Sequence, residues 1–478
     1  MLFNSYEFIF LFLPLTLAGF FFIGRSSHHL AALWLGMASL AFYAWWNPIY
    51  VLLLLASIAA NYGLGYAIGH GAEASKGRLL AIGMVTNLAL LGYFKYADFF
   101  LSSVNAVAGT QWPLLNVVLP LGISFFTFTQ IAFLVDVRRG VAHEYRFVHY
   151  LLFVTYFPHL IAGPVLHHKQ MMPQFQHRAI YRPHGECIAA GLTFFVIGLA
   201  KKVLLADNLG DYATPFFDDA RLGLDPGPIQ AWTGAIAYTL QLYFDFSGYS
   251  DMAIGLSLLL GIRLPVNFDS PYRAANIIDF WRRWHMTLSA FLRDYLYIPL
   301  GGNRLGAGRR YVNLLATMVL GGLWHGANWT FVIWGALHGL FLAINHLWQA
   351  RFADVFGRLP GGRLAARTLT FLAVVVAWVF FRADNLTTAL RIVGGMFGAH
   401  GSVGQMAAIR EQMAYWCLGG LAVVWLAPNS QQLSDGLRDP AACSRFRRLA
   451  THPLWLGVLL ALALSRLSEK SEFLYFQF

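Results

Sequence analysis

The sequence predicts an all-α polytopic membrane protein with about 11–12 transmembrane helices. Of its 478 residues, 58% are hydrophobic and only 12% are charged, whereas soluble domains carry roughly 25% charged residues. No polar stretch is long enough to form a soluble domain. We therefore expect one membrane-embedded domain over residues 1–478, with N-terminal helices in 1–140, a core that carries the chemistry in 141–350 and C-terminal helices in 351–478.

Twelve apolar runs approach the length of about 20 residues that a transmembrane helix needs. The predicted runs are 6–24, 30–46, 49–69, 79–100, 114–135, 187–206, 229–260, 311–324, 329–347, 368–382, 412–427 and 452–468. The first has no basic residue before it and no small-residue cleavage site after it, so we expect an uncleaved span. A further run, 148–163, is broken by Pro158 and is predicted to be re-entrant or interfacial.

The net charge of +11 does not indicate a nucleic-acid-binding protein. Most Lys and Arg residues lie in short loops that would share one side of the membrane, which is the positive-inside pattern. This pattern predicts an outward N-terminus and a cytoplasmic 261–310 segment. The aspartate-rich stretch 207–228 is expected to form an acidic outward loop, and 384–411 a second outward segment.

The segment 275–298 is too polar to span a membrane and is predicted to form one amphipathic interfacial helix. On a helical wheel its apolar face contains Trp281, Trp284, Leu288, Phe291, Leu292, Tyr295 and Leu296. His285 lies within this apolar arc. It is either an interfacial histidine bonded to a neighbouring carbonyl or a second polar group that points into the protein.

Two aspartates, Asp245 and Asp251, interrupt the otherwise apolar run 229–260. An aspartate near the bilayer centre costs about 2.5–3.5 kcal/mol, so both side chains should face a cavity or polar partners. They are candidate catalytic carboxylates. Structural hydrogen bonding is the simpler interpretation, because paired carboxylates alone do not define a reaction.

The apolar stretch 321–335 contains His325 between Trp324 and Gly326. An ionisable side chain in a membrane segment is costly and by default marks a functional site. Burial disfavours the charged imidazole, so His325 is expected to be neutral and able to accept a proton. The alternative is a histidine that fixes helix packing, which is the role expected of His338, about 220° further round the same notional helix.

Five further residues are candidates for contacting substrate. Trp324 and Asn328 lie beside His325, and the Asn328 amide could steady an oxyanion. Asp245 is expected to face a cavity or polar partners. Arg282 and Arg293 either set the topology and bind anionic lipid or attract a phosphate-bearing donor.

Other site types are not indicated. The chain has no Gly-x-Ser-x-Gly elbow and no His-Glu-x-x-His motif, so neither a serine hydrolase nor a zinc protease is predicted. Cys187, Cys417 and Cys443 are too far apart to indicate a disulfide framework or a metal site. We expect no metal.

Three groups of segments resemble the membrane-bound O-acyltransferase (MBOAT) family. They are 243–249 with 265–269, 280–285 with 293–302, and 323–331 with 334–335 and 338–339. The chain ends, 2–5 and 473–478, fit the branch of the family that acetylates bacterial polysaccharides such as alginate. The Trp-His-Gly sequence at 324–326 is specific in this context and would be a weak signal alone.

This resemblance implies a ring of helices around a central cavity that opens to both sides. It implies that His325 is the catalytic residue and that His285 occupies the family's second polar position. It also implies an acyl donor on the cytoplasmic side of a bacterial inner membrane, with acetyl-CoA as a substrate and no tightly bound cofactor. The implied partners are membrane lipid, periplasmic acetyltransferase proteins and an exported polysaccharide as the final acceptor.

Three functions remain open from the sequence. The leading hypothesis is an enzyme that passes an acetyl group across the inner membrane to an exported polysaccharide such as alginate or cellulose. D-alanyl transfer proteins resemble the chain over the same motifs, but they take their acyl group from a carrier protein. A transporter that moves an acyl group or glycan without chemistry is the third, and the lack of an evident two-half repeat counts against it.

Overall fold

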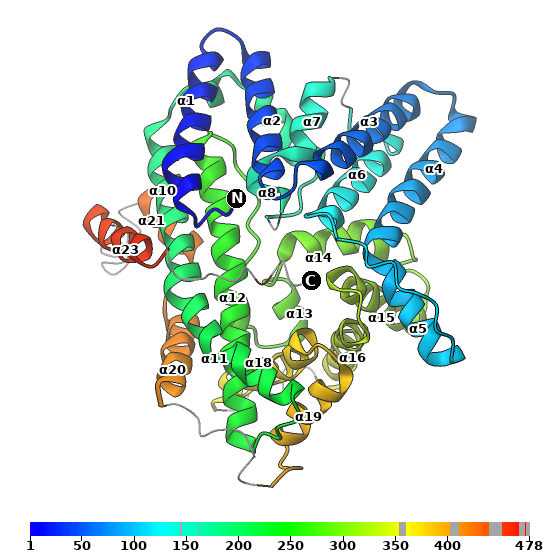
Figure 1. Cartoon of the computed structure of the whole chain (residues 1–478), viewed down its shortest axis with the longest axis vertical. Coiled ribbons are helices and arrows are strands. Elements are labelled where there is room, and N and C mark those ends of the chain that lie inside the picture. Colours follow the sequence, from blue (N-terminus) through cyan, green and yellow to red (C-terminus); the bar gives the residue numbers. More distant parts are fainter. Residues whose placement is uncertain are drawn as a thin grey trace. The chain divides into compact units, whose positions relative to one another are not determined.

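The computed structural model describes residues 1–143, 146–161, 163–352, 360–401, 411–438, 452–467 and 474. These residues form helices joined by loops, without a strand among them (Figure 1). The predicted all-α fold class is therefore confirmed. The chain divides into two compact units, Met1–Gly198 with Tyr249–Pro265, and Leu199–Gly248 with Val266–Phe478. We call these unit 1 and unit 2.

Unit 1 is built on the first helices of the chain. They are η1 (Phe8–Phe12), α1 (Leu13–Gly24), α2 (His28–Ala44), α3 (Ile49–His70), α4 (Glu73–Leu91), η2 (Gly92–Tyr96), α5 (Ala97–Ala108), α6 (Ile123–Arg138), α7 (Phe147–Thr155), α8 (Phe157–Leu160), α9 (His168–Met171) and most of α10 (Gly185–Ala200). Helix α1 packs on α2, and α6 packs on both α3 and α4. Between α3 and α4, the buried Asn87 amide donates to Oδ1 of Asn61 over 2.6 Å, a polar contact that joins helices where water is absent.

The predicted break within 148–163 is present. Helix α7 ends at Thr155, and α8 starts after Tyr156, whose backbone (φ −45°, ψ 106°) is not helical. Pro158 stands in the first turn of α8, where its missing N–H costs no hydrogen bond. The side chains of α8 are buried. This irregular backbone is therefore covered by protein, as such a segment requires at membrane depth.

Unit 2 contains the segments that were predicted to carry chemistry. Its helices are η5 (Lys201–Ala206), α11 (Asp207–Arg221), most of α12 (Pro228–Leu259), η6 (Pro271–Arg273), α13 (Ile277–Trp281), α14 (Met286–Leu292), η7 (Arg293–Tyr297), α15 (Gly306–His325), α16 (Trp329–Phe352), α18 (Gly362–Arg382), α19 (Leu386–Met396), α20 (Glu411–Leu426), α21 (Ser430–Arg438) and α23 (Pro453–Ser465). Part of the predicted outward segment 384–411 is thus helical, and residues 402–410 lie outside the described part.

Each of the twelve predicted apolar runs overlaps a helix. Within the described residues, five helical segments are long and apolar enough to cross a membrane: Ile49–His70, Glu73–Ala108, Gly185–Arg221, Trp329–Phe352 and Gly362–Arg382. Shorter apolar helices lie at Phe8–Gly24, Leu386–Met396, Gln412–Leu426 and Pro453–Ser465. The chain is a multi-pass membrane protein.

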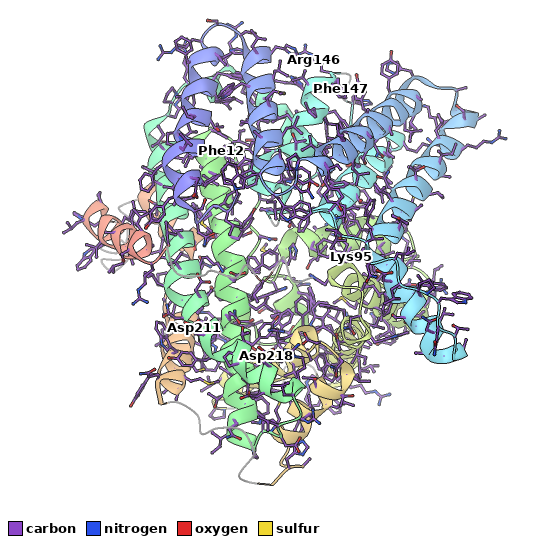
Figure 2. All side chains as sticks on the ribbon, viewed as in Figure 1. Phe12, Lys95, Arg146, Phe147, Asp211 and Asp218 are labelled. Carbon is purple, nitrogen blue, oxygen red and sulfur yellow. The ribbon has the colours of Figure 1, made fainter. Side chains whose placement is uncertain are left out.

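The prediction of an acidic loop at 207–228 is wrong over most of that stretch, because Asp207–Arg221 forms α11. Five apolar side chains at helical spacing are buried along one stripe of this helix: Leu209, Ala213, Phe216, Phe217 and Ala220. Asp211 is exposed and Asp218 is partly exposed, and Figure 2 labels both on α11. The aspartates fill the polar side of an amphipathic helix.

Helices α15 and α16 pack tightly against each other as a hairpin. Helix α15 ends at His325 and α16 begins at Trp329. Glycines allow this close approach. A Cβ added to Gly335 would overlap the carbonyl oxygen of Met318, and one added to Gly322 would overlap the carbonyl oxygen of Phe331. Small residues permit such backbone contact between membrane helices. The hairpin fixes the position of the stretch 321–335.

Candidate functional site

His325 is the last residue of α15 and is 8% exposed. The helix stops there because Gly326 has an extended backbone (φ −160°). Three aromatic rings surround the imidazole, with centroids 4.9 Å away for Trp324, 5.2 Å for Trp334 and 5.1 Å for Phe381. The end of one helix thus places a single imidazole in an aromatic enclosure within unit 2.

His285 interrupts the segment that was predicted to be one amphipathic helix. The prediction of a continuous helix over 275–298 is wrong, because His285 has left-handed backbone angles (φ 41°, ψ 54°) between α13 and α14. The predicted apolar arc is nevertheless buried at Trp284, Leu288 and Phe291. His285 itself is 0% exposed. Its side chain points into the protein, and its ring centroid lies 6.5 Å from that of His325.

Asn267 holds the His285 turn in place. Its carbonyl oxygen accepts the backbone N–H of Met286 over 2.9 Å. Its side-chain Oδ1 faces Nδ1 of His285 at 3.1 Å and accepts the hydroxyl of Thr287 over 2.9 Å. A left-handed residue other than glycine costs roughly 1–2 kcal/mol. These hydrogen bonds, which come from outside the turn, offset that strain.

The contacts of Asn267 also determine which nitrogen of the neutral His285 ring carries the hydrogen. The backbone N–H of Thr287 also points at Oδ1 of Asn267, at 3.3 Å. Because a backbone N–H can only donate, the atom that faces it is the amide oxygen and not the amide nitrogen. Nδ1 of His285 must therefore carry the hydrogen, which leaves the lone pair on Nε2. That Nε2 atom is buried and has no hydrogen-bond partner among the described residues.

Burial lowers the pKa of His285 to about 3. His285 lies outside the helices long enough to cross a membrane. The charged imidazolium loses its hydration in this apolar surrounding, which includes the edge-on ring of Phe246 at 4.8 Å. His285 is therefore neutral at neutral pH and can accept a hydrogen bond or a proton at Nε2.

Asp245 is buried and paired, as its place in an apolar run required. Its Oδ1 lies 2.7 Å from Nζ of Lys202, and the side chains are 3% and 1% exposed. Asp251 is also buried. The buried positions of both aspartates are consistent with the prediction that their side chains avoid lipid.

The side chains of Asp245 and His325 line one cavity in unit 2. Its volume of about 10 Å³ is close to the minimum that a water molecule needs. The rest of its lining is apolar: Leu242, Phe246, Trp284, Trp378, Phe381 and Leu474. The two ionisable groups therefore share a small space from which bulk water is largely excluded.

The other predicted site residues differ in burial and in their partners. Trp324 is 3% exposed and packs on His325. Asn328 donates to the carbonyl oxygen of Asp384 over 2.7 Å and accepts the N–H of Thr330 over 3.1 Å, so its amide caps the start of α16. Arg282 and Arg293 are exposed.

Arg293 and His338 have local partners. Nε of Arg293 donates to Oδ1 of the neighbouring Asp294 over 2.7 Å. His338 is 0% exposed and accepts the indole N–H of Trp281 at Nδ1 over 3.3 Å. Its ring packs on Phe280, Trp281 and Trp334. These contacts fit the packing role expected of His338.

Two important residues were not singled out from the sequence. Asn267 orients His285 and lies in the 265–269 motif, which gave no hint of its partner. Lys202 lies 43 positions before Asp245, and the signal available for it was the Lys201–Lys202 pair within an apolar run. Among the described residues, no group of His, Cys, Asp or Glu is arranged to hold a metal ion.

Comparison with known proteins covers the same region. Residues 123–381 match the family described as MBOAT, membrane-bound O-acyltransferase. The chain is 44% identical to a peptidoglycan O-acetyltransferase of Helicobacter pylori, over 84% of this chain and 80% of the relative. It is 40% identical to a protein of Pseudomonas putida named "Probable alginate O-acetylase AlgI", over the full length of both. A teichoic acid D-alanyltransferase of Streptococcus thermophilus is 31% identical over 51% of this chain and 59% of its own.

Proposed function

Because the chain belongs to the membrane-bound O-acyltransferase family, we propose that this O-acyltransferase transfers acetyl groups toward hydroxyls of a polysaccharide outside the cytoplasm. The observation that carries the proposal is the pair of buried imidazoles, with ring centroids 6.5 Å apart and with the lone pair of His285 fixed on Nε2. A buried imidazole that lines a nearly dry cavity, with a second neutral imidazole close by, suits proton removal from a hydroxyl.

The relatives favour acetyl over D-alanyl transfer. The relatives named for O-acetylation of peptidoglycan or alginate match at least four fifths of this chain. The D-alanyltransferase of Streptococcus thermophilus matches about half. We propose alginate, peptidoglycan or a related polymer such as cellulose as the final acceptor.

His325 is the proposed catalytic base. The acceptor hydroxyl donates its proton to the neutral imidazole while its oxygen attacks the carbonyl carbon of a thioester. A carbon–oxygen bond forms, the carbon–sulfur bond breaks, and the proton passes from His325 to the departing sulfur. Such general-base catalysis contributes on the order of 10²–10⁴ in rate. His285 accepts a hydrogen bond at Nε2 and helps to orient the hydroxyl.

The proposed donor is acetyl-CoA, used as a substrate that approaches from the cytoplasmic side of a bacterial inner membrane. The exposed Arg282 and Arg293 lie in the arginine-rich 261–310 segment, for which the charge pattern predicts that side. Arginine suits recognition of the donor's phosphates. Periplasmic acetyltransferase proteins are proposed to complete the transfer to the exported polymer.

The test uses the purified full-length chain in lipid nanodiscs with radiolabelled acetyl-CoA, with and without periplasmic extract and polysaccharide. We expect release of the CoA thiol together with alkali-labile acetyl ester on an acceptor. A D-alanylated carrier protein, supplied in a parallel reaction, should not be consumed. Consumption of that carrier alone would support a D-alanyl transfer protein, and label movement without thioester cleavage would support a transporter.

A further inference from the structure

A buried ionic cluster in unit 2 lies at the catalytic cavity. Lys202 on η5 is 2.7 Å from Oδ1 of Asp245 on α12 and 2.7 Å from Oδ1 of Asp207 at the start of α11. The backbone of Leu474 also donates a hydrogen bond to the Asp245 carboxylate. A buried ion pair adds little net stability, because removing two charges from water offsets their attraction. Packing alone therefore does not account for this pair.

The position of Asp245 indicates its role. It lines the same cavity as His325, and these two carry the only ionisable side chains among the residues that line it. The cavity has room for about one water molecule. A carboxylate across such a space from an imidazole stabilises the imidazolium, because the low local dielectric strengthens their attraction.

We propose that Asp245, paired with Lys202, is a positioning residue that holds His325 through one bridging water and stabilises its charged form during the transfer. This proposal rests on the proposed role of His325 as the base. When His325 takes the proton of the acceptor hydroxyl, the positive charge on its ring faces the carboxylate. Asp245 keeps its negative charge throughout, and no proton moves to it.

The described residues include other titratable groups near this pair. His285 is the second imidazole beside His325. Tyr238 lies on α12, seven positions before Asp245, and is within electrostatic reach of both Asp245 and Arg382. Arg382 is turned toward Asp384, at 3.7 Å. Asp245 is thus the negative charge that the cavity itself presents to His325.

The test compares D245N with the double variant K202M/D245N, in the full-length protein. An opposite charge within about 4–6 Å shifts a titration by about one to three units. D245N should therefore lower kcat by about 10- to 100-fold, with KM for acetyl-CoA nearly unchanged. The acid limb of the rate–pH profile should move to lower pH, because His325 takes up a proton less readily.

The double variant separates charge from structure. It removes both charges of the Lys202–Asp245 pair, and the remaining carboxylate of Asp207, whose side chain is 22% exposed, keeps access to water. The double variant should therefore unfold at about the same temperature as the unmodified protein. If the negative charge of Asp245 is needed for turnover, K202M/D245N should be as slow as D245N. The proposal is overturned if the double variant recovers normal turnover or if D245N leaves the acid limb in place.

The controls identify which proposal fails. D218N changes a partly exposed carboxylate on α11 and should leave turnover unchanged (Figure 2). If H325Q is inactive while D245N and the double variant are fully active, only the role of Asp245 is wrong. If H325Q is itself active, the proposed function of His325 is wrong as well.

Discussion

Nδ1 of His285 donates a hydrogen bond to Oδ1 of Asn267 over 3.1 Å, and this contact fixes the lone pair of the ring on Nε2. The two residues are 18 positions apart, and both are buried in unit 2. The contact both holds the left-handed turn at His285 and selects the tautomer of its ring. Asn267 is therefore a residue whose replacement should affect both stability and turnover.

The variant N267A should lower turnover and stability together. It removes the acceptor that selects one tautomer of His285 and leaves the hydroxyl of Thr287 without its partner. Losing a partner that orients a histidine reduces activity by about 10- to 100-fold in metal sites, and an unsatisfied buried donor costs about 1–3 kcal/mol. Thermal unfolding in detergent and acetyl-CoA turnover measure the two effects.

The matched variant N267D keeps an oxygen opposite Nδ1 and Thr287. It should retain more activity than N267A, because the tautomer is preserved. Equal activity of N267A and the unmodified protein would show that the Asn267 contact does not matter for catalysis.

The stability of the protein should fall in acid because of His285. Its pKa is lowered by burial to about 3, whereas an unfolded histidine titrates near 6.5. Between these values the unfolded chain binds a proton that the folded chain does not, so folding loses about 1.4 kcal/mol per pH unit as the pH falls. This contribution is fully present above about pH 6.5.

H285Q removes this titration and keeps an N–H donor for Asn267. We expect its unfolding temperature to vary less steeply between pH 6.5 and pH 4 than that of the unmodified protein, by the equivalent of one proton. Identical slopes for the two proteins would contradict the neutral, buried state of His285.

The α15–α16 hairpin should not tolerate a methyl group at Gly335. The added Cβ would overlap the carbonyl oxygen of Met318 on the facing helix. We expect G335A to lose about 1–3 kcal/mol of stability, the usual cost of overpacking. It should also lose activity, because His325 is the last residue of α15 and its position depends on how the two helices pack.

Gly419, in the middle of α20, is the control, because a Cβ there meets nothing within 4 Å. G419A should leave stability unchanged or raise it by up to about 1 kcal/mol, since alanine favours helix over glycine. If both alanine variants behave alike, close packing does not explain the glycines of the hairpin.

His338 should act through packing. H338F removes the acceptor for the indole N–H of Trp281 and keeps an aromatic ring among aromatic neighbours. We expect a loss of about 1–3 kcal/mol in stability and little change in kcat per folded molecule. A loss of turnover as large as that of H325Q, in folded protein, would place His338 in the catalytic site.

The sequence was sufficient to locate the apolar helices and the two histidines. Hydrophobic runs identified the membrane segments because lipid and protein interiors both demand apolar side chains. The cost of an ionisable group in such a run marked His325 and Asp245. The helical wheel placed His285 among apolar neighbours, and its complete burial agrees with that position.

Other features depended on contacts between distant segments. Periodicity cannot show that the chain turns at His285, because the left-handed backbone is held by Asn267 from 18 positions away. The Lys202–Asp245 pair joins positions 43 apart. Aspartate content suggested a loop at α11, although its buried stripe was present in the sequence.

The central claim is that His325 is the base for acyl transfer, and H325Q tests it most directly. Glutamine has a similar polarity and size but cannot accept the proton. H325Q in nanodiscs, with the unfolding temperature of the unmodified protein, should lose acetyl-CoA-dependent acetylation by a factor on the order of 10²–10⁴. Acetylation at the normal rate in folded H325Q would contradict it.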